Sequence, residues 1–314
     1  MNASKSASRT DIPRVVETFV PFGARLEGLD FRRPSDEAVA AVKRALGQHH
    51  VLVSRGHVAP DDDEITAYFR RFGTLCAETP EVKAHYARLA KLVPEYLEGG
   101  AAEIGTRYNL SNVEEDGKKL GGLGNRELEW HNDQSDMPRL KTISCLEALD
   151  FEQGAGNTFF CDMYAALDAL PRETRQALDG LYAIHDSSRY RSADGANIAA
   201  APSASHPVIL AHPDTGRRCL YVNPNFTSSI VGLAKDESDE ILKTVFAHAY
   251  RPEFIYEHLW RTGDLVIWDN VGLQHMRPPI DPTRRRTLRA FQGVAETLSV
   301  RLPGAAASAL RGAA

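Results

Sequence analysis

Apolar residues near the N-terminus follow two helical repeats separated by a short β-branched run. Residues 36–46 carry apolar side chains at helical spacing, and residues 50–54 then predict a strand. Residues 61–72 predict a second helix, because they begin with acidic residues and end at Gly73. The first part of the chain therefore predicts two helices around one strand.

From about residue 106 the pattern changes to short apolar runs separated by turn residues. Two helical segments interrupt these runs, at residues 163–181, with a break at Pro171, and at residues 236–249. We expect a β-rich α+β protein. The predicted strands cover residues 108–113, 128–133, 142–148, 157–161, 208–210, 219–222, 265–268 and 287–291.

The ends of the chain differ in composition from its middle. Residues 1–10 are polar and Ser-rich, and residues 303–314 are rich in Ala and Gly, so we expect a disordered N-terminus and a flexible C-terminal tail. We expect a single catalytic domain over residues 11–302. Within it, residues 114–124 are charged and then glycine-rich, which predicts a mobile loop over the site.

Charge and cysteine usage exclude several classes of partner. The net charge of -5 gives no basic surface for nucleic acid. The four cysteines form no CxxC pair, which suits a reduced compartment, and no apolar run is long enough to span a bilayer. We therefore expect a cytoplasmic protein whose partner is a small molecule, with no membrane contact; a homo-oligomer is left open.

One short motif carries the candidate chemistry. His131 and Asp133 lie two residues apart on a predicted strand, so their side chains point to the same face about 7 Å apart. His275, far downstream, can complete a set of two imidazoles and one carboxylate, which is typical of non-haem iron(II). By itself, a His and an Asp at this spacing is more often a solvated turn.

A run of arginines begins nine residues after His275. On an extended strand Arg285 and Arg289 share one face with Thr287, and Arg286 points to the other face. A guanidinium close to a metal suits the carboxylate of a diacid bound there. The alternative is that these arginines are solvated charges on an edge strand.

At this point the chain resembles the taurine dioxygenase and 2,4-dichlorophenoxyacetate dioxygenase family of iron(II)/2-oxoglutarate enzymes. The resemblance extends from about Val16 to Phe291 and implies a double-stranded β-helix (jelly roll) core with flanking and inserted helices. It rests on seven segments besides the arginine strand: residues 51–56, 69–73, 130–133, 156–160, 206–208, 222–227 and 263–270.

The resemblance implies a role for individual residues. His131, Asp133 and His275 match the iron ligands, and Thr158 and Arg285 match the residues that hold the 2-oxoglutarate carboxylate. Whether Arg285 or Arg286 does so is open, because strand parity does not say which face is inward; the family's Arg-x-x-x-Arg spacing favours Arg285. The remaining candidates bind substrate: Arg289 matches the arginine for an acidic substrate, and Asn112 faces the substrate from a strand edge, with satisfaction of backbone groups as its alternative role.

The resemblance implies an iron(II)- and 2-oxoglutarate-dependent oxygenase that uses O2 and releases succinate and CO2. It would hydroxylate, desaturate or oxidatively decarboxylate a small organic substrate, which is anionic if Arg289 faces the pocket. A natural-product tailoring enzyme and a scavenger of sulfonates or aryloxyacids are both compatible with it. Two other classes stay open: a zinc hydrolase and a non-catalytic metal-binding jelly roll.

Overall fold

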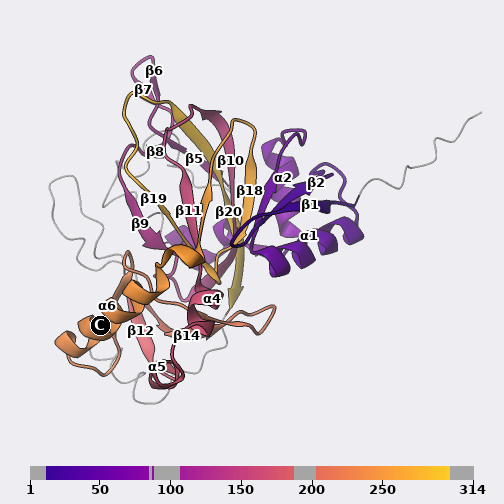
Figure 1. Ribbon diagram of the computed structural model, residues 1–314. Helices are drawn as coiled ribbons and strands as arrows, with labels where there is room; N and C mark the ends of the chain where they lie inside the picture. Colours follow the sequence, from indigo (N-terminus) through magenta and orange to yellow (C-terminus); the bar gives the residue numbers. More distant parts are fainter. Residues whose placement is uncertain (1–11, 85–86, 88–106, 187–202, 298–314) are drawn as a thin grey trace, which may run out of the picture.

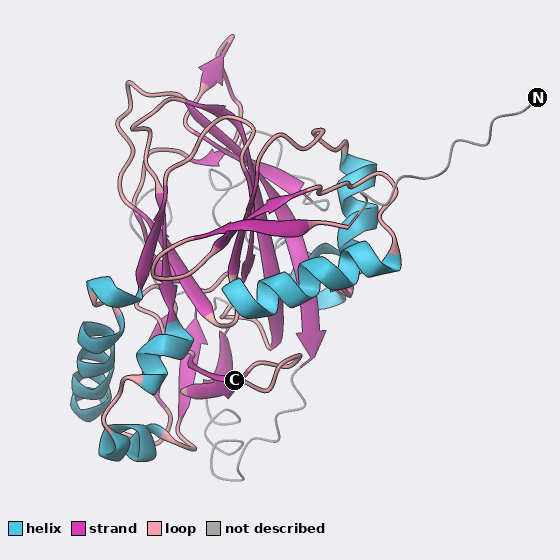
Figure 2. Ribbon diagram, turned by 45° about the vertical axis from the view of Figure 1, so that its right-hand side comes forward, coloured by secondary structure: helices cyan, strands magenta, loops and turns pink. Residues whose placement is uncertain are grey.

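The computed structural model describes residues 12–84, 87, 107–186 and 203–297. The predicted loose ends, residues 1–10 and 303–314, lie outside the described residues. Two β-sheets form the body of the molecule, with one pair of helices beside the larger sheet and a second group of helices at one end (Figures 1 and 2). Together these elements make a β-rich α+β fold, as the pattern of short runs predicts.

The larger sheet has nine strands, in the order β1-β2-β3-β18-β10-β20-β5-β8, with β4 paired to β20. Its neighbours are antiparallel except for the pairs β2–β3 and β5–β8. The long strands β10 and β20 form its centre. Its strands are β1 (Arg14–Thr18), β2 (Ala24–Glu27), β3 (Val51–Ser54), β4 (Thr74–Leu75), β5 (Arg107–Ser111), β8 (Gly122–Leu123), β10 (Arg139–Phe151), β18 (Leu265–Asp269) and β20 (Arg286–Thr297).

The smaller sheet has the order β17-β11-β19-β9, and three further groups of strands are shorter. Its strands are β9 (Leu128–His131), β11 (Thr158–Asp162), β17 (Ile255–His258) and β19 (Leu273–Arg277). A third sheet contains β12 (Tyr182–Asp186), β13 (Ser203–Pro207) and β16 (Thr227–Ile230), and two hairpins pair β6 (Glu114–Glu115) with β7 (Lys118–Lys119) and β14 (Ile209–Ala211) with β15 (Arg218–Leu220).

Two helices cover the outer face of the larger sheet, α1 (Asp36–His49) and α2 (Asp62–Arg70) (Figure 1). Ser35 caps α1 by accepting a hydrogen bond from the backbone of Ala38 at 3.1 Å. Asp61 and Glu64 form a reciprocal capping box on α2, which explains the acidic run there. Further helices in the described parts of the chain are α4 (Met163–Asp168), α5 (Arg172–Leu178), α6 (Lys235–Ala249), η1 (Cys76–Glu78) and η3 (Pro252–Phe254).

Strands β10 and β20 bury side chains on both faces and so separate two cores. On the helix side, Ile143 and Phe291 pack with residues of α1 and α2. On the other side, Leu146, Leu288 and Ala290 pack with side chains of the smaller sheet. The space between the two sheets is therefore apolar and shielded from water, which is the setting of the candidate site.

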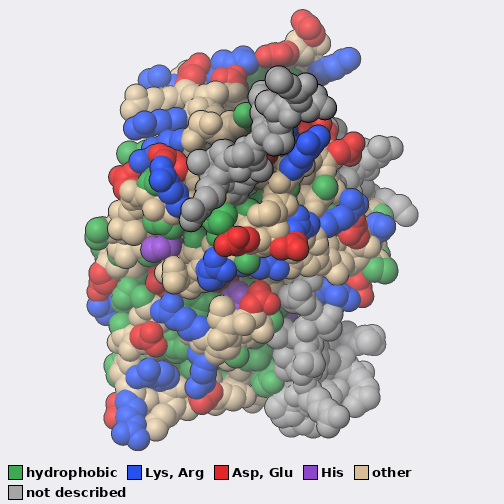
Figure 3. Space-filling model, turned by 90° about the vertical axis from the view of Figure 1, so that its right-hand side faces the viewer, with side chains coloured by type: hydrophobic (Ala, Val, Ile, Leu, Met, Phe, Trp, Pro, Cys, Tyr) green, Lys and Arg blue, Asp and Glu red, His purple; other side chains and the backbone are tan. Residues whose placement is uncertain are grey.

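The helices predicted from apolar spacing are confirmed with shifts of a few residues at their ends, and the break at Pro171 separates α4 from α5. All four cysteines are free and buried, as small core residues are. Across the described parts of the chain, no helix combines the length and apolar character needed to cross a membrane. On the face that carries α1 and α2, acidic and basic side chains are interspersed (Figure 3).

Gly293 lies at an irregularity in the β10–β20 ladder, and we expect any larger residue there to destabilise the fold. A Cβ at this position would lie 1.4 Å from the carbonyl oxygen of Ile143, so Gly293→Ala should lower the unfolding free energy by about 1–3 kcal/mol. Gly47→Ala in α1 is the matched control, because a Cβ there meets nothing within 4 Å. Urea denaturation measures both; equal stability of the two variants would contradict the close packing of the two strands.

A buried histidine of β13 makes the stability depend on pH. His206 donates from Nε2 to the carbonyl of Met137 at 3.0 Å, and burial lowers its pKa to about 4. The unfolded chain, with a pKa near 6.5, takes up the proton first, so stability is complete above about pH 6.5 and falls as the pH approaches 4. We expect His206 to contribute a loss on the order of 2 kcal/mol at pH 5 relative to pH 7.5. His206→Gln removes this part, whereas the part due to other buried histidines such as His185 and His275 stays. Urea denaturation at both pH values tests this; an equal loss in the variant would contradict it.

Candidate active site

The pairing of β9 with β19 sets two histidines side by side. His131 lies directly opposite His275 in the ladder, and the centroids of their rings are 4.1 Å apart. Asp133 follows two residues later, so that its Oδ1 is 3.6 Å from the Nε2 atom of each imidazole. One ligand atom from each of these residues lies within 4.8 Å of the other two. The structure thus brings the predicted triad together.

A hydrogen bond orients one of the two histidines for metal binding, and burial keeps the other uncharged. His131 donates from Nδ1 to the carbonyl of Glu129 at 2.7 Å, which leaves the lone pair of Nε2 directed at the centre of the triad. His275 is 8% exposed, and its burial, together with the nearby His131, lowers its pKa to about 3. An uncharged imidazole is the form that binds a metal ion.

Asp133 is held as a carboxylate in one orientation. Burial opposes its ionisation, yet the ammonium of Lys141 and the two imidazoles keep its pKa well below the usual range. Its Oδ2 accepts hydrogen bonds from Lys141 Nζ at 2.9 Å and Ser144 Oγ at 2.7 Å, so Oδ1 alone faces the histidines. Two imidazole nitrogens and one carboxylate oxygen form a donor set that suits iron(II).

The sequence analysis missed Lys141 and Ser144. A strand with strict alternation would put positions 141 and 144 on opposite faces, but the β10–β20 register shifts between Lys141 and Ile143 and again before Cys145. The available signal was a lysine directly before the strand predicted at residues 142–148. Its buried ammonium is unusual without a partner of opposite charge.

Beside the triad, the space between the sheets forms a pocket with both apolar and cationic walls. Leu110 and Leu146 come from the larger sheet, and Leu128 comes from the smaller one. The polar lining is Thr158, His275, Arg277 and Arg286. The Oγ1 atom of Thr158 accepts a hydrogen bond from Trp260 Nε1 at 2.9 Å, which leaves the hydroxyl proton to be donated elsewhere.

Of the two arginines left open by the sequence, Arg286 and not Arg285 lines this pocket. Arg285 precedes β20 and lies at the surface, where it pairs with Asp150 and Glu115 at 2.9 Å each. Arg286, the first residue of the strand, is 3% exposed and lines the pocket. Parity then turns Leu288 and Ala290 to the same side as Arg286.

Arg289, the predicted contact for an acidic substrate, has partners within the protein. Arg289 lies on the helix side of β20, where its guanidinium pairs with buried Glu147 and with Asp62 at 3.3 Å. It also donates to the carbonyl of Pro60 at 3.0 Å. Its side chain therefore attaches the start of α2 to the sheet and points away from the triad.

Asn112 has the second of its two predicted roles, the satisfaction of backbone groups. Its amide donates to the carbonyl of Arg284 at 2.7 Å and to Asn125 Oδ1 at 2.9 Å, and its Oδ1 accepts from the backbone nitrogen of Arg286 at 2.9 Å. The side chain thus braces the start of β20. That brace fixes the backbone from which the Arg286 side chain enters the pocket.

The glycine-rich segment reaches the pocket as predicted, but with regular structure. Residues 114–119 form the β6–β7 hairpin, and β8 pairs with β5, so that Leu123 and Gly124 line the pocket. A Cβ at Gly121 would lie 2.4 Å from the carbonyl oxygen of Asn109. Glycine is needed there for this close approach.

Comparison with known proteins identifies a matching family and several relatives of this chain. A model of the family "Taurine catabolism dioxygenase TauD, TfdA family" matches residues 14–291. Pentalenolactone F synthase from Streptomyces arenae is 34% identical over 298 residues, covering 89% of this chain and 93% of that protein. The alpha-ketoglutarate-dependent 2,4-dichlorophenoxyacetate dioxygenase from Cupriavidus pinatubonensis is 32% identical over 280 residues, covering 85% of this chain and 93% of that protein.

A solved structure extends the likeness to three dimensions. The crystal structure of AAD-2 in complex with Mn(II) and N-oxalylglycine superposes with a TM-score of 0.69 at 25% identity, covering 91% of this chain and 98% of that chain. Sequence and structure agree over nearly the whole chain. The protein therefore belongs to the TauD/TfdA family and is an iron(II)- and 2-oxoglutarate-dependent dioxygenase.

Proposed function

We propose that His131, Asp133 and His275 bind the iron(II) and that Arg286 and Thr158 bind the distal carboxylate of 2-oxoglutarate. The two facing sheets would then be the double-stranded β-helix of the family, with α1 and α2 as flanking helices. The domain would comprise residues 11–302. A cytoplasmic location is part of the same proposal, supported by four free cysteines.

The observation that carries this proposal is the buried guanidinium of Arg286, for which no ion pair is found among the described residues. The side chain is almost fully buried, and its Nε has no hydrogen-bond partner. Burial, with the neighbouring Arg277, holds its pKa well below the usual range. A buried charge without an acid is strongly unfavourable, so this geometry fits a pocket that is completed by an anion.

Arg277 adds a second cation to the same pocket. It is 3% exposed, and it donates from Nη1 to the carbonyl of Gly124 at 3.1 Å and from Nη2 to the carbonyl of Arg126 at 2.5 Å. These bonds attach the glycine-rich segment to β19, two residues after His275. We infer that Arg277 strengthens the positive potential at the carboxylate end of the pocket and positions its wall.

Iron(II), 2-oxoglutarate and O2 supply the oxidising chemistry, with succinate and CO2 as products. The chain itself contributes orientation and exclusion of water. Lys141 and Ser144 occupy Asp133 Oδ2 and so leave one oxygen for the metal, while Phe160 and Trp268 pack beside His275 with ring centroids 6.2 and 5.0 Å away. A dry, rigid site limits side reactions.

The substrate is a small organic molecule, and we propose a tailoring role, supported by the likeness to pentalenolactone F synthase. An anionic substrate was expected only if Arg289 faces the pocket. The guanidinium of Arg289 pairs with Glu147 and Asp62. Leu288 and Ala290, which share the face of Arg286, are apolar. Scavenging of an aryloxyacid remains the second candidate, supported by the likeness to the 2,4-dichlorophenoxyacetate enzyme.

The two alternatives from other classes lose their support. A zinc hydrolase needs no arginine pocket beside the triad, and a non-catalytic binding protein needs no neutral, open metal site. Membership of a dioxygenase family over residues 14–291 argues against both. Hydroxylation, desaturation and oxidative decarboxylation stay open as outcomes, because all three start with removal of hydrogen from the substrate.

Replacing any one metal ligand by alanine should abolish catalysis. For His131→Ala, Asp133→Ala and His275→Ala we expect iron-dependent release of succinate from 2-oxoglutarate to fall more than about 100-fold, with loss of iron(II) binding in an anaerobic titration. Asp150→Ala is the matched control, since Asp150 is a surface acid paired with Arg285. Succinate release at the wild-type rate from any ligand variant would refute the assignment.

Substitutions of Arg285 and Arg286 should show which of the two arginines contributes to 2-oxoglutarate binding. We expect Arg286→Leu to raise KM for 2-oxoglutarate by about 10- to 100-fold, because a charge-assisted pairing with the carboxylate is lost. Arg285→Leu should leave KM within about twofold, since its ion pairs are exposed. Initial rates of succinate formation measure both. The reverse order of effects would restore Arg285 to the pocket and overturn the proposed role of Arg286.

A further inference from the structure

A second cavity lies behind the larger sheet, on the side away from the metal ligands. Its volume is about 310 Å³, which is the lower end of the range for small-molecule sites. Successive residues of β18 separate the two sites: Trp268 packs beside His275, whereas the carboxylate of Asp269 faces the cavity. The polar part of its lining includes Lys43, His50, Tyr164, His212, Arg217 and Asp269.

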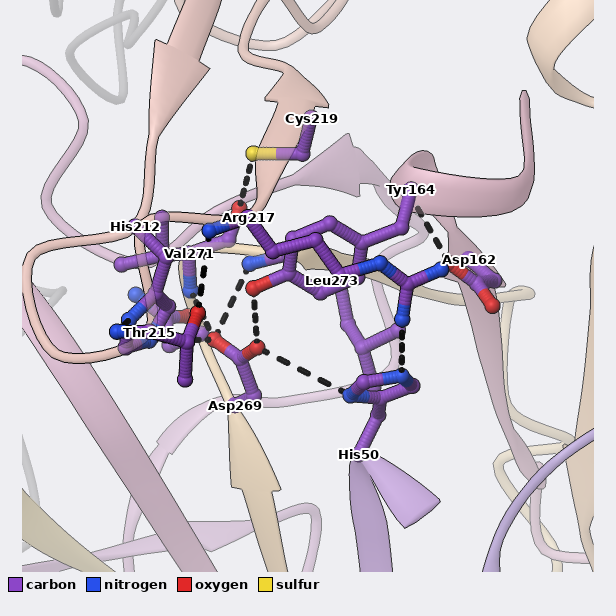
Figure 4. Close-up of polar contacts among 12 residues, drawn as sticks. His50, Asp162, Tyr164, His212, Thr215, Arg217, Cys219, Asp269, Val271 and Leu273 are labelled. Carbon is purple, nitrogen blue, oxygen red and sulfur yellow. Dashed lines mark hydrogen bonds and ion pairs between the residues drawn. The ribbon is translucent and has the colours of Figure 1, made fainter. Parts of the chain in front are cut away.

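Asp269, the acid that faces this cavity, already has hydrogen-bond partners within the protein. Asp269 accepts hydrogen bonds from Tyr164 Oη at 2.7 Å and from the backbone nitrogens of Val271 and Gly272 at 2.9 and 3.0 Å (Figure 4). His212 Nε2 lies 3.4 Å from Oδ1 of Asp269. The His212 ring is held in this orientation because its Nδ1 accepts a hydrogen bond from the backbone nitrogen of Asp214. Asp269 therefore has little need of a cationic ligand.

Two cations and an unpaired donor surround the same space. Arg217 stacks on the ring of Tyr164 at 4.3 Å and donates from Nη1 to His50 Nε2 at 2.9 Å, so the hydrogen of His50 is on Nδ1 (Figure 4). Among the described residues that Nδ1 has no hydrogen-bond partner, although His50 is only 5% exposed; Asp269 Oδ2 is 4.0 Å away, and the carboxylate of Asp162 also attracts a proton to this imidazole. Lys43 lies at the mouth, where Nζ donates to the carbonyl of Phe72 at 3.3 Å.

The opposite wall is apolar. Leu46 of α1, Phe72 and Ile143 of β10 line it, and all three are buried. Of the acids near the mouth, Asp214 lies on an exposed turn, and Asp168 is 3.8 Å from Arg217 in an exposed pair, where attraction is weak. An occupant is thus offered a positive end and an apolar wall.

We propose that this cavity is a second small-molecule site, which binds an organic anion with an apolar body. The anionic group lies between Lys43 and Arg217 and within reach of His50, and the body packs on Leu46, Phe72 and Ile143. The site is separate from the one that holds 2-oxoglutarate, and its occupation does not depend on iron.

The cavity wall and the backbone of a metal ligand belong to one hydrogen-bonded unit. Asn270, next to Asp269, accepts from the backbone nitrogen of Asp133 at 3.0 Å and donates to the carbonyl of Asp133 at 3.1 Å. Asn132 donates to the carbonyls of Asn270 and Leu273 at 2.9 Å each. A molecule bound beside Asp269 therefore contacts the segment that positions Asp133.

Benzoate is a suitable probe, because it has one carboxylate on an apolar ring. It is titrated by calorimetry into the anaerobic iron(II)·2-oxoglutarate complex while the charge-transfer absorption of that complex is followed. We expect saturable binding with the absorption band retained. Gly47→Leu, whose side chain fills the mouth, and Arg217→Gln should each weaken binding by about tenfold or more, whereas Gly47→Ala should not.

Neutral benzamide should bind about tenfold more weakly than benzoate. Binding of benzamide as tight as that of benzoate overturns the anion site. So does the absence of benzoate binding, unchanged affinity in Gly47→Leu, or bleaching of the band, which means binding at the metal. If the band never forms, the assignment of the metal site fails, and the same titration of the metal-free protein still decides the cavity.

Discussion

The antiparallel pairing of β9 with β19 is the constraint on which the site depends. It sets His131 opposite His275 at a fixed spacing, and the turn after β9 brings Asp133 back to the same point. Asn132, between two of the proposed ligands, is fully buried, and its amide holds the carbonyls of the segment that precedes β19. Side chains of three residues therefore converge without any movement of the backbone, which is the condition for a preorganised metal site.

Part of this site could be predicted from the sequence because it depends on local geometry. The spacing of His131 and Asp133 predicted that their side chains meet, although the strand ends at His131 and a turn, not strand alternation, places Asp133; the resemblance to a known family adds His275 and Thr158. Strand alternation could not decide between Arg285 and Arg286, because it puts them on opposite faces but does not say which face points inward. That choice is made where Asn112 fixes the start of β20, at a contact between residues distant in sequence.

The same limit explains what was missed or misassigned in the rest of the fold. Lys141 and Ser144 reach Asp133 through irregular pairing of β10 with β20, which no periodic pattern encodes. Arg289 has a guanidinium that suits an anionic substrate, but this group pairs with buried Glu147 and with Asp62 at the start of α2. Strand β13 (Ser203–Pro207) is too polar to be recognised from an alternation of apolar and polar residues. In each case a tertiary partner outweighs the local signal.

The two neighbouring guanidiniums of Arg277 and Arg286 have a consequence for the lifetime of the protein. In the absence of a bound diacid, like charges face each other in a medium of low polarity, and the native state bears that repulsion. An occupant relieves it and stabilises the folded form by mass action. If 2-oxoglutarate binds Arg286 as proposed, the bound protein should open less often and resist proteolysis better than the empty protein.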